Sequence, residues 1–367
     1  MSAPASLRWI ARAGVGALAL AAWTCSVDEA PPPTPIRWPV PANLGGELPS
    51  PARNPITAEG VALGRRLFFD PGLSRTGTIA CATCHRPELG FSDGGERSVG
   101  ASGRPLRRHT PALVNLAWMD GYFWDGGARD LESQVFAPLF SDDEMGADLD
   151  SLLATLRGDP GYVDAFRQAF GAAPSLPFVA RALAQYERTL VAADSRYDRH
   201  VRGEDPTALG VDERRGLELF RQSCAGCHVP DLFTDGAYHN TGLDAVFPED
   251  HERVAWGRAR ITGECGDIGK FRTPSLRNVA LTAPYMHDGR FATLGEVVDH
   301  YRGGFVRSPT LDPRIAGPDG APRIVLSDDD AAALVAFLEA LTECALENPQ
   351  VRAPNRRSTP GTGREDP

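Results

Sequence analysis

The sequence contains the pattern Cys-x-x-Cys-His twice, at residues 81–85 (CATCH) and 224–228 (CAGCH). Two thiols at this spacing can add to the two vinyl groups of a haem, and the adjacent histidine can then bind the iron, which is how c-type haems are attached. A zinc site built from the four cysteines is the alternative, but it would leave both histidines without a role. We therefore predict two covalent c-type haems, held by Cys81, Cys84, His85, Cys224, Cys227 and His228.

The residues that precede the two motifs also repeat. Gly-Arg-Arg-Leu-Phe at 64–68 and Gly-Leu-Glu-Leu-Phe at 216–220 each lie near the end of a helix-like stretch, at 57–69 and 212–221. A chain of 367 residues, 42% of them hydrophobic, is long enough for two domains with their own cores. We expect a mainly α fold of two tandem cytochrome c-like domains, each with one covalent c-type haem. The domains are expected at residues 51–205 and 206–351.

Apolar residues at three- and four-residue spacing predict further helices. The last of these begins after Ser327, a residue type that caps helices, with Asp330 at the third position. The polar stretch 197–206 (YDRHVRGEDP) indicates a linker between the domains. Signals for strands are few. The predicted helices span residues 131–139, 149–156, 162–170, 178–190, 293–301 and 328–341.

Residues 1–25 are predicted to be an export signal. Two arginines precede an apolar run at 13–24 that is too short to span a bilayer. Cys25 ends this run, so either the protein is secreted in a plain form or Cys25 is acylated as a lipid anchor. The mature chain is expected in the periplasm, with a proline-rich linker at 26–50 and a disordered tail at 352–367. A net charge of −10 without a basic stripe argues against a nucleic-acid partner.

Some cysteines and histidines stand outside the motifs. Of seven cysteines, four belong to the haem motifs and one to the signal. The remaining two, Cys265 and Cys344, either form a disulfide in the oxidising compartment or stay unpaired. His200, His239 and His251 have no motif around them and are predicted at the surface.

Several segments resemble the bacterial di-haem cytochrome c peroxidase family, and within it the MauG branch, which includes the MbnH-type proteins. The similarity spans about residues 55–343, and the segments occur in the family's order and spacing. It implies a peroxidase-type oxidoreductase whose two haems have different roles. Besides the two motifs, the segments are 64–69, 124–127 (WDGG), 131–134 (LESQ), 271–278 (FRTPSLRN) and 283–289 (APYMHDG).

The resemblance makes the first haem the peroxide-reactive one. It places Glu144 as the acid/base group, with Gln134 and Pro138 over the same distal face. A carboxylate can carry a proton, an amide can hold peroxide or water, and proline cannot bind iron. The alternative for Glu144, in an Asp-Asp-Glu run, is a surface acid. Peroxidases of this family carry a histidine in the next loop that blocks the iron until reduction. Residues 86–108 contain none, so the site is expected to be open without an activation step.

At the second haem the resemblance predicts Tyr301 as the second axial ligand. The peroxidases carry methionine fourteen residues after the histidine of the Pro-Tyr-Met-His-Asp-Gly segment, and the MauG branch carries tyrosine. Counted from His287, this position is Tyr301. An anionic phenolate stabilises ferric and higher states, whereas a thioether stabilises the ferrous state. His300, Met286 and Met145 remain alternative ligands.

The resemblance also concerns the region between the haems. The resemblance puts Trp124 between the two haems, where an indole can relay an oxidising equivalent. The alternative is that Trp124 is an aromatic residue of the hydrophobic core. The family's calcium ion would be bound by the carbonyl oxygens of Thr282 and Pro284. The family's asparagine ligand is replaced by His109, and imidazole suits Ca²⁺ poorly. Calcium binding, direct or through water, is therefore left open.

We predict a periplasmic enzyme that uses hydrogen peroxide to form a high-valent di-haem state and then oxidises a tryptophan or tyrosine of a partner protein. One alternative is a cytochrome c peroxidase that reduces hydrogen peroxide with electrons from a small redox protein. Another is a non-catalytic di-haem electron carrier. Tyr301 argues against the first alternative, and Glu144 with Gln134 argues against the second. In the branch member that matures an amine dehydrogenase, holes leave through a surface tryptophan. Gln222 stands at that position here, so a different partner or docking route is expected.

Overall fold

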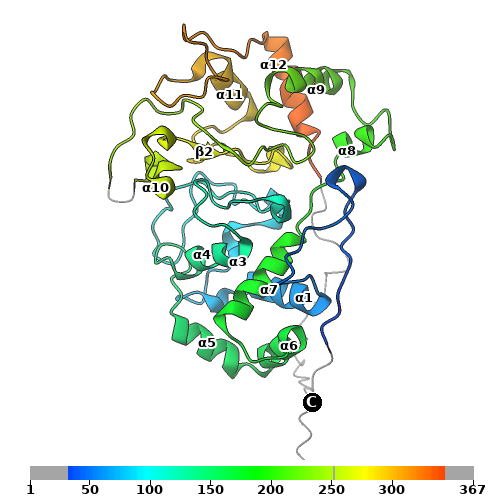
Figure 1. The fold of residues 1–367 in the computed structure, drawn as a ribbon, viewed down its shortest axis with the longest axis vertical. Helices are drawn as coiled ribbons and strands as arrows, with labels where there is room; N and C mark the ends of the chain where they lie inside the picture. Colours follow the sequence, from blue (N-terminus) through cyan, green and yellow to red (C-terminus); the bar gives the residue numbers. More distant parts are fainter. Residues whose placement is uncertain (1–31, 251–252, 344–367) are drawn as a thin grey trace, which may run out of the picture.

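The computed structural model describes residues 32–250 and 253–343, which form two helical halves that follow one another along the chain (Figure 1). As predicted, the fold is mainly α. In the described ranges the only strands of more than one residue are β1 (Tyr238–His239) and β2 (Phe271–Arg272), which pair antiparallel. Over the same ranges, no helix has the length and apolarity needed to cross a membrane. The predicted export signal, Cys25 and the C-terminal tail lie outside the described residues.

The helices agree with most of the predicted ranges. Those expected at 57–69, 149–156, 162–170, 178–190, 212–221 and 328–341 form with ends shifted by a few residues. The helices are α1 (Ala58–Phe68), α2 (Cys81–Cys84), α3 (Leu131–Gln134), α4 (Phe136–Phe140), α5 (Leu149–Gly158), α6 (Pro160–Phe170), α7 (Leu176–Arg188), α8 (Arg196–Val201), α9 (Val211–Ser223), α10 (Ala259–Thr262), α11 (Leu294–Asp299) and α12 (Asp328–Glu339).

Each half is built on one close helix pair, α1 with α7 and α9 with α12. A Cβ atom on Gly64 would lie 1.9 Å from the carbonyl oxygen of Ala182, and one on Gly216 would lie 2.0 Å from that of Ala333. Real Cβ atoms do not approach so closely, so both positions require glycine. The glycines that precede the two Cys-x-x-Cys-His motifs are therefore explained by the contact between helices, and the repeat extends to α7 and α12.

The loops of the two halves repeat in the same register. Asn115 and Asn278 both have a φ of 57°. Their backbone N–H groups donate to the carbonyls of Leu190 and Leu341, at 2.8 and 3.2 Å. Ala182 and Ala333 are the residues that contact the two glycines. Leu190 follows Ala182 by as many residues as Leu341 follows Ala333. The second half therefore repeats the helix pair and this loop of the first half, which allows residues of α7 and α12 to be compared position by position.

The junction between the halves is reciprocal. The N–H of His109 donates to the carbonyl of His287 at 2.9 Å, and the N–H of Arg272 donates to the carbonyl of Trp124 at 2.8 Å. Next to Trp124 lies the buried Asp125, whose carboxylate accepts from guanidinium groups of both halves, namely those of Arg108 at 2.9 Å and Arg260 at 3.1 Å. Trp124 and His287, each followed by Asp-Gly in the sequence, thus occupy equivalent positions.

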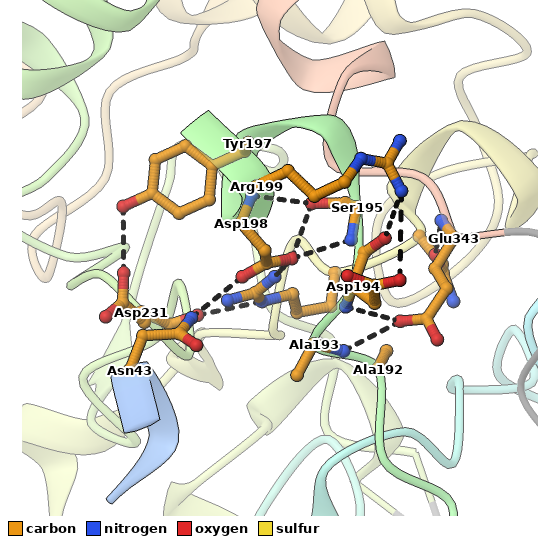
Figure 2. A network of polar contacts seen from close by, with 12 residues as sticks. Asn43, Ala192, Ala193, Asp194, Ser195, Tyr197, Asp198, Arg199, Asp231 and Glu343 are labelled. Atoms are coloured by element: carbon orange, nitrogen blue, oxygen red, sulfur yellow. Dashed lines mark hydrogen bonds and ion pairs between the residues drawn. The ribbon is translucent and has the colours of Figure 1, made fainter. Parts of the chain in front are cut away.

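The segment expected as a polar linker at 197–206 is instead partly helical and partly buried, so that prediction is wrong. Figure 2 shows the polar network around this segment, which begins with α8. Ser195 caps α8, and Asp198 is fully buried, where it forms an ion pair with the equally buried Arg277. The phenol of Tyr197 donates to Asp231 at 2.8 Å. Asp198, one of the charges that suggested solvent exposure, is thus paired inside the molecule.

Two other predicted helices end differently from the expectation. The helix expected at 131–139 is divided at Val135 into α3 and α4. Pro138 has no N–H to donate to the carbonyl of residue 134, and its ring crowds that carbonyl. The helix expected at 293–301 ends as α11 at Asp299 and continues as a π-helical turn, His300–Gly304. Such turns are frequent at functional sites.

Candidate functional site

A cavity of about 350 Å³ lies in the first half, next to the first Cys-x-x-Cys-His motif. Its lining is largely apolar and comes mainly from α2, α3, α4, α7 and loops of the first half, with Val254, Arg260 and Arg272 contributed by the second half. The structure brings the first motif and the predicted distal residues to this one place. The lining includes Cys81, Cys84, His85, Trp124, Gln134, Pro138 and Glu144.

The first motif forms a single helical turn, α2, in which the N–H of His85 donates to the carbonyl of Cys81 at 2.9 Å. The Nδ1 atom of His85 donates to the carbonyl of Phe91 at 2.9 Å. Phe91 has a φ of 61°, which turns this carbonyl toward the ring. Burial lowers the pKa of His85, so the imidazole is neutral. A neutral imidazole with Nδ1 bonded offers Nε2 to a metal.

The second motif is built in the same way. The N–H of His228 donates to the carbonyl of Cys224 at 2.9 Å, and Nδ1 donates to the carbonyl of Phe233 at 3.1 Å. Phe233 has a φ of 56°, and burial lowers the pKa of His228. Two thiols beside a neutral, oriented imidazole are the donor set that a covalent haem needs. The residues present fit such a group at both motifs.

Glu144 belongs to the cavity rather than to the surface. In the Asp-Asp-Glu run, the exposed Asp142 pairs with Arg75, and Asp143 pairs with Arg104. Glu144 turns inward, and burial, with a smaller contribution from Asp143, raises the pKa of its carboxyl group. The pKa of this carboxyl group is therefore closer to neutral pH than that of an ordinary glutamate, which suits a group that both takes up and releases a proton.

The break between α3 and α4 positions the other distal residues. Gln134 ends α3, and Pro138 lies in α4, and both line the cavity. Trp124 reaches the same cavity from the junction, where its indole N–H donates to the carbonyl of His109 at 2.8 Å. The ring nitrogens of His109 are bonded to the carbonyl of Gly95 and the hydroxyl of Ser92. This histidine is thus held away from any role as a blocking ligand.

Tyr301 lies in the π-helical turn, beside the second motif. Burial, together with the neighbouring Cys224 and Cys227, raises the pKa of its phenol. The alternative ligand His300 donates from Nε2 to the carbonyl of Thr241 at 2.9 Å, so this nitrogen is engaged. Met145 lines the first cavity and not the second motif, so the structure contradicts it as a ligand there.

The calcium prediction gains no support from side chains. Both ring nitrogens of His109 have hydrogen-bond partners, which removes it as a direct ligand. No contact tests the carbonyls of Thr282 and Pro284. Among the described residues, one cluster of possible metal-binding side chains is present, and it contains Cys227, Asp235 and His239. Its thiol belongs to a haem motif, so we assign it no separate metal.

His239, predicted at the surface, is half-buried. Its ring nitrogens bond to the carboxylates of Asp312 at 2.8 Å and Asp235 at 2.9 Å. His200 is also partly covered, and its Nδ1 is buried without a partner among the described residues. His251 and Cys344 lie outside the described ranges. The disulfide predicted between Cys265 and Cys344 is therefore not tested, and Cys265 is exposed.

Sequence reasoning missed three polar residues near the site, of which Glu187 and His287 are buried and Arg272 is half-buried. Glu187 and Arg272 line the first cavity. His287 stacks on Phe271 with ring centres 3.6 Å apart, and burial lowers its pKa to about 3. A comparison of the two repeats, with Trp-Asp-Gly beside His-Asp-Gly and α7 beside α12, would have drawn attention to His287 and Glu187.

Both halves of the chain match models of known protein families. A family model described as di-haem cytochrome c peroxidase matches residues 58–206, and one described as cytochrome c matches residues 213–342. The methylamine utilization protein MauG of Methylorubrum extorquens is 42% identical over 298 residues, which cover 80% of this chain and 81% of that protein.

Two further proteins extend the comparison. The cytochrome c551 peroxidase of Pseudomonas aeruginosa is 36% identical over 297 residues, which cover 78% of this chain and 80% of that protein. The crystal structure of a MauG-like protein associated with microbial copper homeostasis superposes with a TM-score of 0.73 at 34% identity. That superposition covers 91% of this chain and all of the other.

Proposed function

Because the chain belongs to the di-haem cytochrome c peroxidase family that includes MauG, we propose that it uses hydrogen peroxide to oxidise a tryptophan or tyrosine of a partner protein in the periplasm. Membership confirms the predicted family, two tandem cytochrome c-type domains and a peroxidase-type oxidoreductase, and it implies two c-type haems. The observation that supports the finer proposal is that His85, Gln134, Pro138 and Glu144 line one and the same cavity.

Each motif in this proposal holds one haem by its two thiols and binds the iron through histidine. When bound, the first haem would supply an iron that binds peroxide and the electrons that the O–O bond takes up as it breaks. His85 keeps the proximal side fixed through its bond to the carbonyl of Phe91. On the distal side Pro138 has no atom that binds iron, so that face stays available to peroxide.

Glu144 moves the proton that peroxide cleavage requires. Its carboxylate takes the proton from the peroxide oxygen nearer the iron and returns it to the distal oxygen, which leaves as water. The side-chain amide of Gln134 holds the leaving oxygen in place. Over the full reaction, two electrons pass from the aromatic side chain to peroxide, and two protons complete the second water molecule.

Tyr301 favours a shared oxidised state over ordinary peroxidase turnover. An anionic phenolate on the second haem stabilises high oxidation states, so this haem can hold one of the two oxidising equivalents. Trp124 lies between the first cavity and the reciprocal bonds of the junction, where an indole can relay charge. The second haem is thus an oxidant store rather than an entry point for electrons.

Stopped-flow mixing of the fully ferric holoenzyme with one equivalent of hydrogen peroxide tests this function. We expect an immediate spectral change without prior reduction, and a product that persists until an aromatic reductant is added. If no change occurs until one haem is reduced, and a reduced small c-type cytochrome then supports rapid turnover, the enzyme is an ordinary cytochrome c peroxidase and the proposal fails.

A further inference from the structure

Glu187 is a buried carboxylic acid in the wall of the first cavity that the proposed reaction does not use. It lies on α7, one helical turn after Leu183, and both residues line the cavity. Its side chain is only 5% exposed, and its Oε2 atom has no hydrogen-bond partner among the described residues. A buried carboxyl oxygen without a hydrogen bond lowers the stability of the folded protein, unless an interaction in the cavity offsets the lost hydration.

The internal repeat shows that the fold does not require an acid at this position. Ala182 on α7 and Ala333 on α12 make the same contact with the glycines of α1 and α9. In this register the counterpart of Glu187 is Leu338, which is buried in the core of the second half. The same helix position is filled by a leucine in one half and by an acid in the other. The carboxyl group is therefore particular to the first cavity.

Among the residues that the structure describes, no arginine or lysine forms an ion pair with this carboxyl group. The neighbouring Arg188 is directed to Glu132, on α3, at 2.9 Å. Burial is the main cause that raises the pKa of Glu187 to about 8, and the charge of Glu132 adds to it, while Arg188 opposes them. Tyr122 and the thiol of Cys81 also lie close enough to feel its charge. At neutral pH, Glu187 is thus mainly a neutral acid.

We infer that Glu187 is a redox-linked proton carrier of the first haem: it loses its proton when this site is oxidised and regains one when the site is reduced. On oxidation the O–H bond of the carboxyl group breaks, its electron pair stays on the carboxylate, and the proton passes to water. The new negative charge offsets the positive charge that oxidation adds to the cavity. Leu338 provides no such group for the second haem.

This inference depends on a haem in the first cavity but not on the partner protein or on the reaction with peroxide. It concerns the ferric/ferrous couple, which any di-haem member of the family has. A result that contradicts the proposed function therefore does not contradict the role of Glu187. A result that contradicts the role of Glu187 does not contradict the proposed function.

The test is a potentiometric titration of the holoenzyme, with both haems followed by their spectra between about pH 6 and pH 9. Reduction takes up the Glu187 proton, so the potential of the first haem should fall as pH rises. The limit is a tenfold change in the reduction equilibrium per pH unit, or about 59 mV for one electron. The variants are Glu187→Gln and Glu187→Leu. The second places at this position the residue type of its counterpart in the second half, Leu338. The second haem is the control within the same molecule.

We expect both variants to lose most of the pH dependence at the first haem and to leave the second haem unchanged. Equal pH profiles for the first haem in all three proteins would overturn the inference, as would equal changes at both haems. Denaturation gives a second readout. A raised folded-state pKa makes the wild type lose stability relative to Glu187→Leu as pH rises from about 5 to about 8. The absence of this divergence would also count against it.

Discussion

Glu144 and Glu187 face one cavity from different elements, and their surroundings give them different tasks. Glu144 sits in a loop, directly after the exposed ion pairs of Asp142 and Asp143. Glu187 lies on a core helix, and its Oε2 atom has no hydrogen-bond partner in the part of the chain that the structure describes. Burial raises the pKa of both carboxyl groups. The first is suited to proton transfer during catalysis and the second to charge compensation.

Glu144→Gln should slow the reaction of the ferric enzyme with peroxide by roughly 10²- to 10⁴-fold, because the amide cannot take up the peroxide proton. In the wild type the rate should fall as pH drops through the raised pKa of Glu144, since the protonated acid is not a base. Stopped-flow rates across pH measure both effects. Haem content should not change, and a variant with wild-type rate and pH profile would remove Glu144 from the mechanism.

Tyr301→Met should raise the potential of the second haem, because a neutral thioether replaces an anionic phenolate. It should also weaken the shared oxidised state, while peroxide access at the His85 haem stays intact. Redox titration and near-infrared spectra after addition of peroxide report these changes. An unaltered spectrum and potential at the second haem would mean that another residue is the ligand, with His300 the first to test.

At the scale of elements, much of the fold could be predicted because helices carry local signals. Periodic apolar residues and the cap at Ser327 located the long helices. The break after Gln134 was missed although Pro138 is visible in the sequence, and α8 was missed because its charges are paired with distant residues such as Arg277. An ion pair between residues far apart in the chain produces no periodic pattern in the sequence, so it cannot be predicted from local residues.

Gly64→Ala should destabilise the protein by about 1–3 kcal/mol, because the added methyl group meets the carbonyl of Ala182 and must push α1 away from α7. Gly158→Ala, at the end of α5, is the matched control. Nothing lies within 4 Å of its added Cβ, so it should be neutral or slightly stabilising. Chemical denaturation measures both. Equal stability of the two variants would contradict the close helix contact.

The whole molecule depends on the junction, where equivalent residues of the two halves exchange bonds. The family segments placed Trp124 between the haems, and the structure puts it at this junction. The sequence could not predict that His287 is its counterpart or that Asp125 is buried between Arg108 and Arg260. These contacts arise only when two loop regions far apart in the chain meet.

Asp125→Asn should cost about 3–5 kcal/mol of stability, because it leaves the mostly buried guanidinium of Arg108 without its counter-charge. It should also disturb communication between the haems, since it loosens the segment that carries Trp124. The control, Asp142→Asn, removes an exposed pair with Arg75 and should cost less than about 1 kcal/mol. If both substitutions cost the same in denaturation experiments, Asp125 does not hold the junction.

In the proposed function, two oxidising equivalents from one peroxide molecule are divided between the two haems. Mössbauer spectroscopy of the ⁵⁷Fe-enriched, fully ferric enzyme after one equivalent of hydrogen peroxide tests it most directly. We expect both iron signals to lose their ferric parameters together, without prior reduction. A change confined to the iron bound by His85, or no change until the enzyme is first reduced, would contradict it.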